Sequence, residues 1–428
     1  MRVALLTQYY APEIGAPQVR LGALARVFAS RGHEVQVLTA MPSYPAGRVL
    51  PDYGGLLRRE ARDGISIVRC WSYPTQSVQF GPRVASYLSF TMAASLVGTA
   101  LLRRPDFLIV ESPPLLLGLA GRWLSLAKRT RMIFNVSDLW PDSAVRLGAL
   151  RAGGLAHRLS NRLEAGCYER AWLVSGQSLE IVTSISKRFP RCRTYHLSNG
   201  VDSRWFRPDQ KTRASRATLG PEETCIALYA GLHGLAQGLD QLVEAGSRLD
   251  LPTDPALVLV GDGPEKAALV ARAGQEKASR VRFLPARPHA EMPALVASAE
   301  IVVIPLRTHL PGAVPSKLYE AMASGRPVVL VAEGEAASIV KNHQAGIVVP
   351  PGDVGGLIEA LRALAGDATL RETLGGNGRR AAEQHFDRDI LLGRFAQLLE
   401  EELGTPPVAA SKHGSFLGKA RTPAALGR

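Results

Sequence analysis

The chain has 428 residues, with 51 Lys and Arg against 38 Asp and Glu, and a formal net charge of +13. This length exceeds what one hydrophobic core usually serves, so two domains are expected. With 46% hydrophobic residues and four cysteines that form no CxxC pair, the composition is that of a globular protein. It argues against a zinc site or a disulfide framework and favours a reducing compartment.

The positive charge is concentrated in the first half of the chain. Residues 1–200 carry 25 Lys and Arg against 12 Asp and Glu, whereas residues 201–428 carry 26 of each kind. Two interpretations stay open at this point. The excess is either a solvated, Arg-rich surface or an attraction to anionic lipid, phosphate-bearing acceptors or nucleic acid.

Short apolar runs alternate with amphipathic stretches of helix length. The N-terminus MRVALLTQYY lacks the apolar core and cleavage site of a signal peptide, so it is predicted to hold the first strand. A helix over RLGALARVFASRG is predicted to end at Gly32. Strands buried on both faces and separated by helices indicate parallel, doubly wound sheets. The strands are predicted at 3–7, 35–39, 65–70, 106–110, 132–136, 171–174, 226–230, 256–260, 281–284, 301–306 and 327–331.

Residues 84–102, VASYLSFTMAASLVGTALL, carry no charge and are flanked by arginines. Their number is close to that of a membrane span. Many small and hydroxyl-bearing residues dilute the hydrophobicity, and a strand-like run follows at once. A packed or interfacial helix is therefore favoured over a true span.

The alternation breaks over residues 197–220, LSNGVDSRWFRPDQKTRASRATLG, where a linker is predicted. The chain then divides into domains 1–200 and 201–387, with a late helix over about 388–403 joining the first domain. The basic, Pro/Ala/Gly-rich end, 404–428, is expected to be disordered. Ligands of open parallel sheets bind beyond the carboxyl ends of the strands, so two facing domains predict an interdomain cleft.

The stretch VPSKLYEAMASGRPVV (314–329) follows an apolar strand and opens a helix. Ser316 is a plausible cap, and free N–H groups of the first turn suit a diphosphate. Lys317 adds a positive charge, and Glu320, one turn on, can accept hydrogen bonds from a vicinal diol such as ribose. The structural alternative is an exposed Lys–Glu pair that stabilises the helix by about 0.2–0.5 kcal/mol.

GDGPEK (261–266) is a strand-to-helix turn, with Pro264 predicted in the first helical turn. A lone GxG is a weak nucleotide signal. Because a third glycine at fingerprint spacing is missing, a dinucleotide oxidoreductase is disfavoured.

Taken with YAGLHGLAQGLDQL, LVGDGPEKAAL, LSNGVDSRWF and YYAPEIGAPQVRLGALARVFASRGHEVQVLT, this motif resembles the retaining glycosyltransferases of family 4. The nearest resemblance is to the subgroup serving colanic acid, O-antigen and capsule synthesis, over roughly residues 1–400. It implies the GT-B fold, an α/β architecture of two facing Rossmann-like domains. The C-terminal domain would hold a nucleotide-sugar in the cleft, and the N-terminal domain would present the acceptor.

On the donor side, the resemblance makes Glu320 the last acid of the family's E-x7-E signature, which binds the ribose. The first acid would fall at Gly312, so it is missing, and backbone amides of 312–314 would hold the sugar hydroxyls instead. An Arg and a Lys that grip the diphosphate in many relatives are replaced by Leu232 and Gln237. Lys317 therefore carries more of that role. The other expected donor-site residues are Gly15, Ala16, Gly231, His233, Gly263 and Ser316, with Arg307 as a helper.

On the acceptor side, NVSDLWPDSA keeps Asp138, whereas Ser137 stands where many relatives have a histidine. Asp138 is predicted to be catalytic or to position the acceptor; the alternative is that it caps the following helix. Glu111, at the end of its own strand, is a second catalytic candidate. His196 and Asn199 are expected to form the turn that joins the domains.

The implied reaction moves a hexose from a UDP- or GDP-sugar to an acceptor hydroxyl with retention of configuration. The leaving phosphate would help to take the proton, and Lys317 with helix N-termini would stabilise its charge. No cofactor is expected. Metal dependence is not expected either, because the only D-x-D, Asp387–Asp389, opens a late helix.

The basic first half and the uncharged helix suit a protein on the cytoplasmic face of the membrane, in peripheral contact with anionic lipid. The resemblance suggests a polyprenyl-diphosphate-linked sugar as acceptor. Two alternatives remain: an epimerase of the same fold, or a catalytically weak nucleotide-sugar-binding partner. A nucleic-acid binder ranks last, since no basic-aromatic platform is present.

Overall fold

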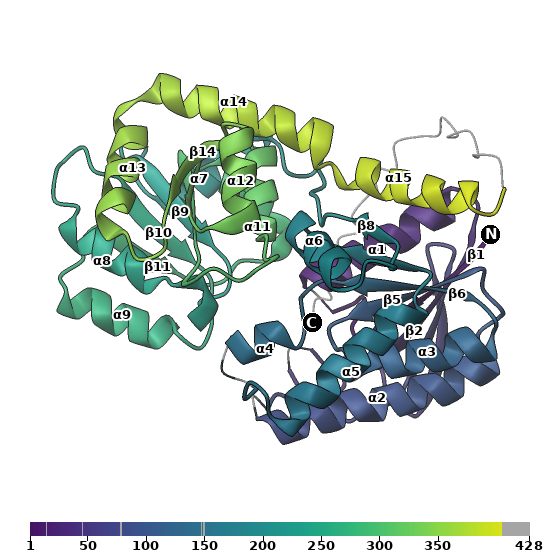
Figure 1. Ribbon diagram of the computed structural model, residues 1–428. Coiled ribbons are helices and arrows are strands. Elements are labelled where there is room, and N and C mark those ends of the chain that lie inside the picture. The colour runs from purple at the N-terminus through teal and green to yellow at the C-terminus, as the bar shows by residue number, and fades with distance from the viewer. Residues whose placement is uncertain (14, 45, 78, 147, 149, 405–428) are drawn as a thin grey trace, which may run out of the picture.

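The computed structural model describes residues 1–13, 15–44, 46–77, 79–146, 148 and 150–404. It contains two α/β domains, each built on a single sheet (Figure 1). The predicted basic tail lies outside the described residues, apart from Gly404.

The N-terminal sheet has eight strands in the order β3-β4-β2-β1-β5-β6-β7-β8. All neighbours pair in parallel except β3 and β4, which are antiparallel. The strands are β1 (Arg2–Leu6), β2 (Glu34–Ala40), β3 (Leu57–Arg62), β4 (Ile65–Cys70), β5 (Phe107–Ser112), β6 (Arg131–Val136), β7 (Leu173–Gly176) and β8 (Thr194–His196).

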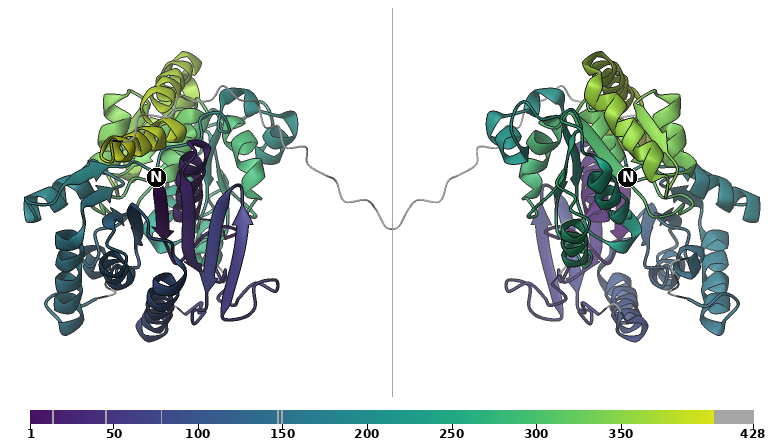
Figure 2. Two further views of the ribbon diagram at one scale, coloured as in Figure 1. Left: turned by 90° about the vertical axis from the view of Figure 1, so that its right-hand side faces the viewer. Right: turned by 90° about the vertical axis from the view of Figure 1, so that its left-hand side faces the viewer.

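Two helices cover one face of this sheet and four cover the other. Alternate residues of each strand face opposite helix layers. Val3 and Leu5 pack with α1 (Ala16–Ser30) and α15 (Arg388–Glu401). Ala4 and Leu6 belong to the opposite core. That core includes α2 (Phe80–Leu101), α3 (Leu117–Ala127), α5 (Leu155–Arg170) and α6 (Leu179–Arg188). Figures 1 and 2 show α15 and α2 on opposite sides of the domain. The short α4 (Asp142–Arg146) follows β6.

The C-terminal sheet has six parallel strands in the order β11-β10-β9-β12-β13-β14. The strands are β9 (Ile226–Ala230), β10 (Ala256–Val260), β11 (Val281–Leu284), β12 (Ile301–Pro305), β13 (Val328–Val331) and β14 (Gly346–Val349). One core joins the sheet to α7 (Arg213–Leu219), α10 (Met292–Ala297), α11 (Ser316–Ala323), α12 (Gly334–Asn342) and α14 (Ala368–His385). The other joins it to α8 (Asp240–Arg248), α9 (Lys266–Gln275) and α13 (Val354–Gly366).

The chain crosses between the domains twice, and the two crossings touch. Val201, in the first crossing, bridges Asp387, which precedes α15 in the second. The Arg388 guanidinium donates to the carbonyl oxygens of Asn199 and Gly200, at 3.0 Å each. α15 then packs on α1, where Arg31 and His33 bind the buried Glu400. The last described helix is therefore part of the N-terminal domain's core.

Every predicted apolar run forms a strand, but β3, β8 and β14 were not predicted. Two helix starts also differ from expectation. α9 begins at Lys266, so Pro264 precedes the helix instead of lying in its first turn. α11 begins at Ser316, with Pro315 in the capping position.

Candidate functional site

The first turn of α11 lies just beyond the carboxyl end of β12. Ser316 is its first helical residue, so the prediction that Ser316 caps the helix is wrong by one position. Proline at the capping position has no side-chain acceptor, and no side chain of the described residues caps this end. The Leu318 amide donates to the carbonyl of Pro315, at 3.0 Å, and within the described residues the amides of Ser316 and Lys317 remain available to an anion.

Lys317 extends from α11 across the end of β9. Its Nζ lies 5.6 Å from the centroid of the Tyr229 ring. Gly231 has φ +149°, and a Cβ on it would lie 2.2 Å from Cε of Lys317. A side chain at 231 would therefore displace the lysine. The predicted donor-site residues Gly231 and Lys317 are brought together by this contact.

Lys317 and Glu320 form a charged pair one helical turn apart. Burial lowers the pKa of Lys317, and Glu320 acts in the opposite direction. Within the described residues, neither side chain makes a hydrogen bond or a salt bridge, although both are only partly exposed. A half-buried cation and acid without protein partners are what a ligand with a phosphate and a diol would complete.

His233 was expected to help grip the diphosphate, but the structure buries it completely. Its ring packs near those of Tyr229 and Phe283, at centroid distances of 5.9 and 6.2 Å. Burial lowers the pKa of His233 below that of an exposed histidine. The expected contact with the diphosphate is therefore not open in this conformation, because the His233 ring is packed beneath the loops after β9 and β10.

Gly263 serves the same packing. Its φ is +156°, and a Cβ there would lie 2.4 Å from the carbonyl oxygen of His233. The amide of His233 also donates to the carbonyl of Asp262, at 2.8 Å. Gly263 thus lets the loops after β9 and β10 close on each other.

Two of the three amides expected to hold sugar hydroxyls, those of Gly312 and Ala313, are engaged by the protein itself. The Gly312 amide donates to Oε2 of Glu180, from α6 of the other domain, at 2.6 Å. The Ala313 amide donates to the carbonyl of Leu310. The expected helper Arg307 is likewise occupied, since it binds Asp240 at 3.0 Å. Those predicted ligand contacts are not open in this conformation.

Glu180 makes a second contact across the domains. Its amide donates to Oε2 of Glu335, at 2.8 Å. One residue thus accepts from the loop before α11 and donates to the start of α12. These two hydrogen bonds connect α6 to the C-terminal domain beside the loop that precedes α11.

Glu111, a predicted catalytic candidate, lies in a buried network and is 2% exposed. Its carboxylate accepts from the Arg20 guanidinium at 2.5 Å and from Ser137 and Asn135 at 2.6 Å each. Through these three hydrogen bonds, Glu111 orders the ends of β5 and β6. The expectation that it faces the acceptor is corrected: it is a positioning residue.

Arg20 extends this network to the domain linker. Its guanidinium donates to Asn199 Oδ1 at 2.5 Å and to Gln177 Oε1 at 3.2 Å. Arg388 donates to the carbonyl of Asn199. Burial lowers the pKa of Arg388, and the nearby Glu320 offsets part of this shift. The network therefore runs from the N-terminal sheet to both segments that cross between the domains. Asn199 joins the domains as predicted, whereas Arg20 and Gln177 gave no local sequence signal.

Asp138 lies just past the end of β6 and is partly exposed. Burial raises its pKa, whereas hydrogen bonds from the Ser143 hydroxyl and the Leu139 amide lower it. Ser143 belongs to α4, so Asp138 also steadies the start of that short helix. Both expected roles are compatible with this position.

Gly15 precedes α1 with an extended backbone, φ 179°. A Cβ at this position would lie 2.5 Å from the Gln18 side chain. Ala16 is the first residue of α1, and its side chain lies outside the described set. Hydrogen bonds of the described residues do not connect Gly15 or Asp138 to Lys317.

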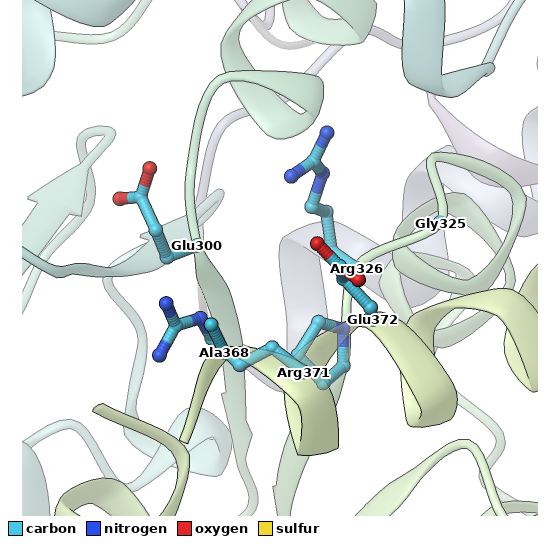
Figure 3. A pocket seen from close by; sticks show the side chains of 7 residues that line it. Glu300, Gly325, Arg326, Ala368, Arg371 and Glu372 are labelled. Carbon is cyan, nitrogen blue, oxygen red and sulfur yellow. The ribbon is translucent and has the colours of Figure 1, made fainter. Parts of the chain in front are cut away.

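Two pockets lie at the amino ends of strands, one pocket in each domain. One, of about 350 Å³, sits before β12 and β13, where Arg326 and Arg371 lie among Glu300 and Glu372 (Figure 3). The other, of about 780 Å³, surrounds the amino end of β1. Ligands of parallel sheets bind at the carboxyl ends, so neither pocket is the candidate donor site. In the described part of the chain, no three His, Cys, Asp or Glu side chains cluster as metal ligands would.

Two domain families match the chain, one for each sheet. Residues 15–200 match the glycosyl transferase 4-like domain, and residues 210–381 match glycosyl transferases group 1. Among curated proteins, the putative colanic acid biosynthesis glycosyl transferase WcaI of Escherichia coli is 26% identical over 408 residues. That alignment covers 92% of this chain and 98% of WcaI.

Solved structures show the same fold over most of the chain. Sucrose-phosphate synthase from Thermosynechococcus elongatus superposes with a TM-score of 0.74 at 19% identity, covering 94% of this chain and 99% of that one. Anabaena HepE, solved in complex with UDP and glucose, gives 0.69 at 18% identity, covering 94% and 100%. The predicted GT-B fold is confirmed, and the chain belongs to the GT-B glycosyltransferases of the family 4 type.

Proposed function

We propose that this glycosyltransferase moves a hexose-type sugar from a UDP- or GDP-sugar to an acceptor hydroxyl, with retention of configuration. The observation that carries the proposal is the pair Lys317 and Glu320 at the uncapped start of α11, whose side chains make no hydrogen bond or salt bridge within the described residues. A diphosphate suits the helix N-terminus and the lysine, and a ribose diol suits the carboxylate. The complex of HepE with UDP and glucose supports a nucleotide-sugar donor.

In this proposal, charge on the leaving diphosphate is stabilised by Lys317 and the amides of α11, and the leaving phosphate oxygen takes the acceptor proton. No protein nucleophile and no metal are needed. The only D-x-D of the sequence supports this view, because Asp387 caps α15 by accepting from the Ile390 amide at 3.2 Å. Transfer in excess EDTA should continue, and its complete loss would contradict metal independence.

The proposed acceptor is a sugar on a polyprenyl diphosphate, used in the synthesis of a bacterial surface polysaccharide. The name of the relative WcaI, a putative colanic acid biosynthesis glycosyl transferase, supports a role in polysaccharide synthesis. The proposed location is the cytoplasmic face of the membrane, which the positive charge of residues 1–200 favours.

A thermal-shift screen with UDP, GDP and their sugars tests the donor site. One nucleotide series should raise Tm in the natural protein and in Lys341→Ala, which removes an exposed lysine of α12. The shift should disappear in Lys317→Ala and Glu320→Ala. An unchanged shift in both variants would place the nucleotide elsewhere.

Product analysis then tests the reaction. Retention predicts that the anomeric configuration of the product, read by NMR coupling constants, equals that of the donor. Conversion of the donor without any acceptor would identify an epimerase. Tight donor binding without turnover, over several lipid acceptors, would identify a binding partner.

A further inference from the structure

The outer faces of α2 and α3 expose six large apolar side chains, which we call the α2–α3 face. Among the described residues, α2 is the one helix that is long and apolar enough to cross a membrane. Only 28% of its most apolar stretch is buried in the protein. The exposed fractions reach 73% at Leu96 and 66% at Met92. The face consists of Leu88, Met92, Leu96, Leu119, Trp123 and Leu126.

These side chains form one continuous surface. On α2, Phe90 and Ala94 are fully buried in the core that includes α3, so Leu88, Met92 and Leu96 must point outward. α3 lies beside α2, because Nε1 of Trp123 donates to the Thr99 hydroxyl at 2.9 Å. Figure 1 shows the two helices next to each other along the edge of the domain. A patch of this kind on one face marks an interaction site.

The charged side chains on α2 and α3, and those directly after each helix, are all basic. The sequence contains no Asp or Glu between residues 64 and 105 or between 112 and 137. Arg83 precedes the apolar part of α2, and Arg104 follows it. Lys128 and Arg129 follow α3, and Nζ of Lys128 binds the carbonyl of Thr99 at 2.7 Å. Arg103, directly after α2, pairs with Glu34 at 3.0 Å, and the other cations of the two helices add a net positive charge. An apolar surface on helices with only basic charges is complementary to anionic headgroups around acyl chains.

We propose that the α2–α3 face docks the protein on an anionic bilayer, with the six apolar side chains entering the interfacial region. α2 stays packed on its domain and does not cross the membrane. A crossing helix would have to withdraw Phe90 and Ala94 from the core. The proposal gives the lipid-linked acceptor of the proposed function a physical surface, and it rests on that function only for the acceptor's identity.

Vesicle sedimentation tests the docking without donor or acceptor. The full chain should bind vesicles of phosphatidylcholine with phosphatidylglycerol, and binding should weaken when salt rises from roughly 0.1 M to roughly 1 M. Met92→Glu/Leu96→Glu should lower the affinity at least about tenfold. The matched control Leu251→Glu/Val270→Glu changes two exposed apolar residues of the other domain and should bind like the natural protein. Undiminished binding of the first variant would overturn the proposal.

A second measurement does not depend on destabilising substitutions. Lipids brominated in their acyl chains should quench tryptophan fluorescence of the bound protein, and Trp123→Phe should remove most of that quenching while binding is kept. Quenching unchanged in Trp123→Phe would place another surface in the membrane.

Sedimentation equilibrium separates lipid from a protein occupant. A natural dimer that ignores vesicles and dissociates in Met92→Glu/Leu96→Glu would assign the face to a second copy and overturn the proposal. Vesicle binding that persists in a protein without sugar transfer would contradict the proposed function alone.

Discussion

The charged side chains at the carboxyl edges of the two sheets differ in how far the protein itself satisfies them. At the N-terminal edge, Glu111 and Arg20 are buried and joined at 2.5 Å, and Ser137 and Asn135 also donate to the carboxylate. At the C-terminal edge, Lys317 and Glu320 lie one turn apart without protein partners in the described chain. The first edge is satisfied internally, and the second is left to be satisfied by a ligand.

This difference separates structural from ligand-binding charges. A buried ion pair with further hydrogen bonds fixes geometry, and removing one partner strands the other. A half-buried cation at an uncapped helix start costs stability unless an anion arrives. The predictions below test whether each edge behaves in this way, from the largest expected effect to the smallest.

Glu111→Ala should lower the free energy of unfolding by about 3–5 kcal/mol, because the Arg20 guanidinium stays buried without its carboxylate. The measurement is urea denaturation, with Glu244→Ala, which breaks the more exposed pair to Arg248, as the control. Replacing both partners, in Arg20→Met/Glu111→Leu, should cost less than Glu111→Ala. A stable Glu111→Ala protein without transferase activity would instead mean that Glu111 contacts a substrate.

Lys317→Met should lower kcat/KM for the donor about a hundredfold to a thousandfold, since a cation at the developing phosphate charge is removed. Because burial lowers the pKa of Lys317, the ammonium loses its proton at lower pH than an exposed lysine. Donor affinity should therefore fall as pH rises through this pKa, and Lys317→Arg should abolish that basic limb. An unchanged pH profile in Lys317→Arg would contradict the assignment.

Asp138→Asn should lower kcat about a hundredfold, the usual range for a lost acid–base group. Burial raises the pKa of Asp138, so the ionised form is lost at higher pH than for an exposed aspartate as the solution is acidified. Transfer should show an acid limb that Asp138→Asn removes. Ser143→Ala tests the capping alternative: loss of α4 order with normal kcat would favour it.

Glu320→Gln should raise the donor KM about tenfold with little change in kcat, because a ribose contact binds ground and transition states alike. A 2′-deoxy donor provides the control. The natural enzyme should discriminate against it, and Glu320→Gln should not. Equal discrimination by both enzymes would show that Glu320 does not hold the ribose.

Glu180→Ala should lower the donor KM a few-fold, within the about 0.5–1.5 kcal/mol of one net hydrogen bond. The substitution frees the Gly312 amide, which Glu180 now holds at 2.6 Å. Steady-state kinetics at fixed acceptor concentration measures the effect. A higher KM would show that Glu180 itself contributes to donor binding.

The strands of the core were predictable because burial on both faces gives continuous apolar runs such as ALVLV and IVVIP. The missed strands do not satisfy that condition. β3, LRREAR, is a charged, antiparallel edge strand, and pairing with β4 defines it more than its own composition. β8 has three residues, too few for a pattern to stand out, and β14 is an edge strand in which only Val349 is fully buried.

Within the candidate site, local spacing was informative only where one element carries the whole feature. Lys317 and Glu320 share a turn of α11, so sequence spacing placed them together. His233 and Glu111 were misplaced because other elements bury them: the loop after β10 covers the first, and α1 supplies Arg20 to the second. Such contacts between distant segments leave no periodic trace.

The sequence by itself determined two parallel α/β domains, the helix start that carries Lys317 and Glu320, and the concentration of positive charge in the first domain. These features arise from local periodicity and composition. Only the tertiary structure decided which charged side chains pair with each other. It also decided that Glu180 accepts from the Gly312 amide and that the outer side of α2 remains exposed. Each of these depends on which segments pack together, and burial, not residue type, then sets whether a polar or apolar group is free to bind.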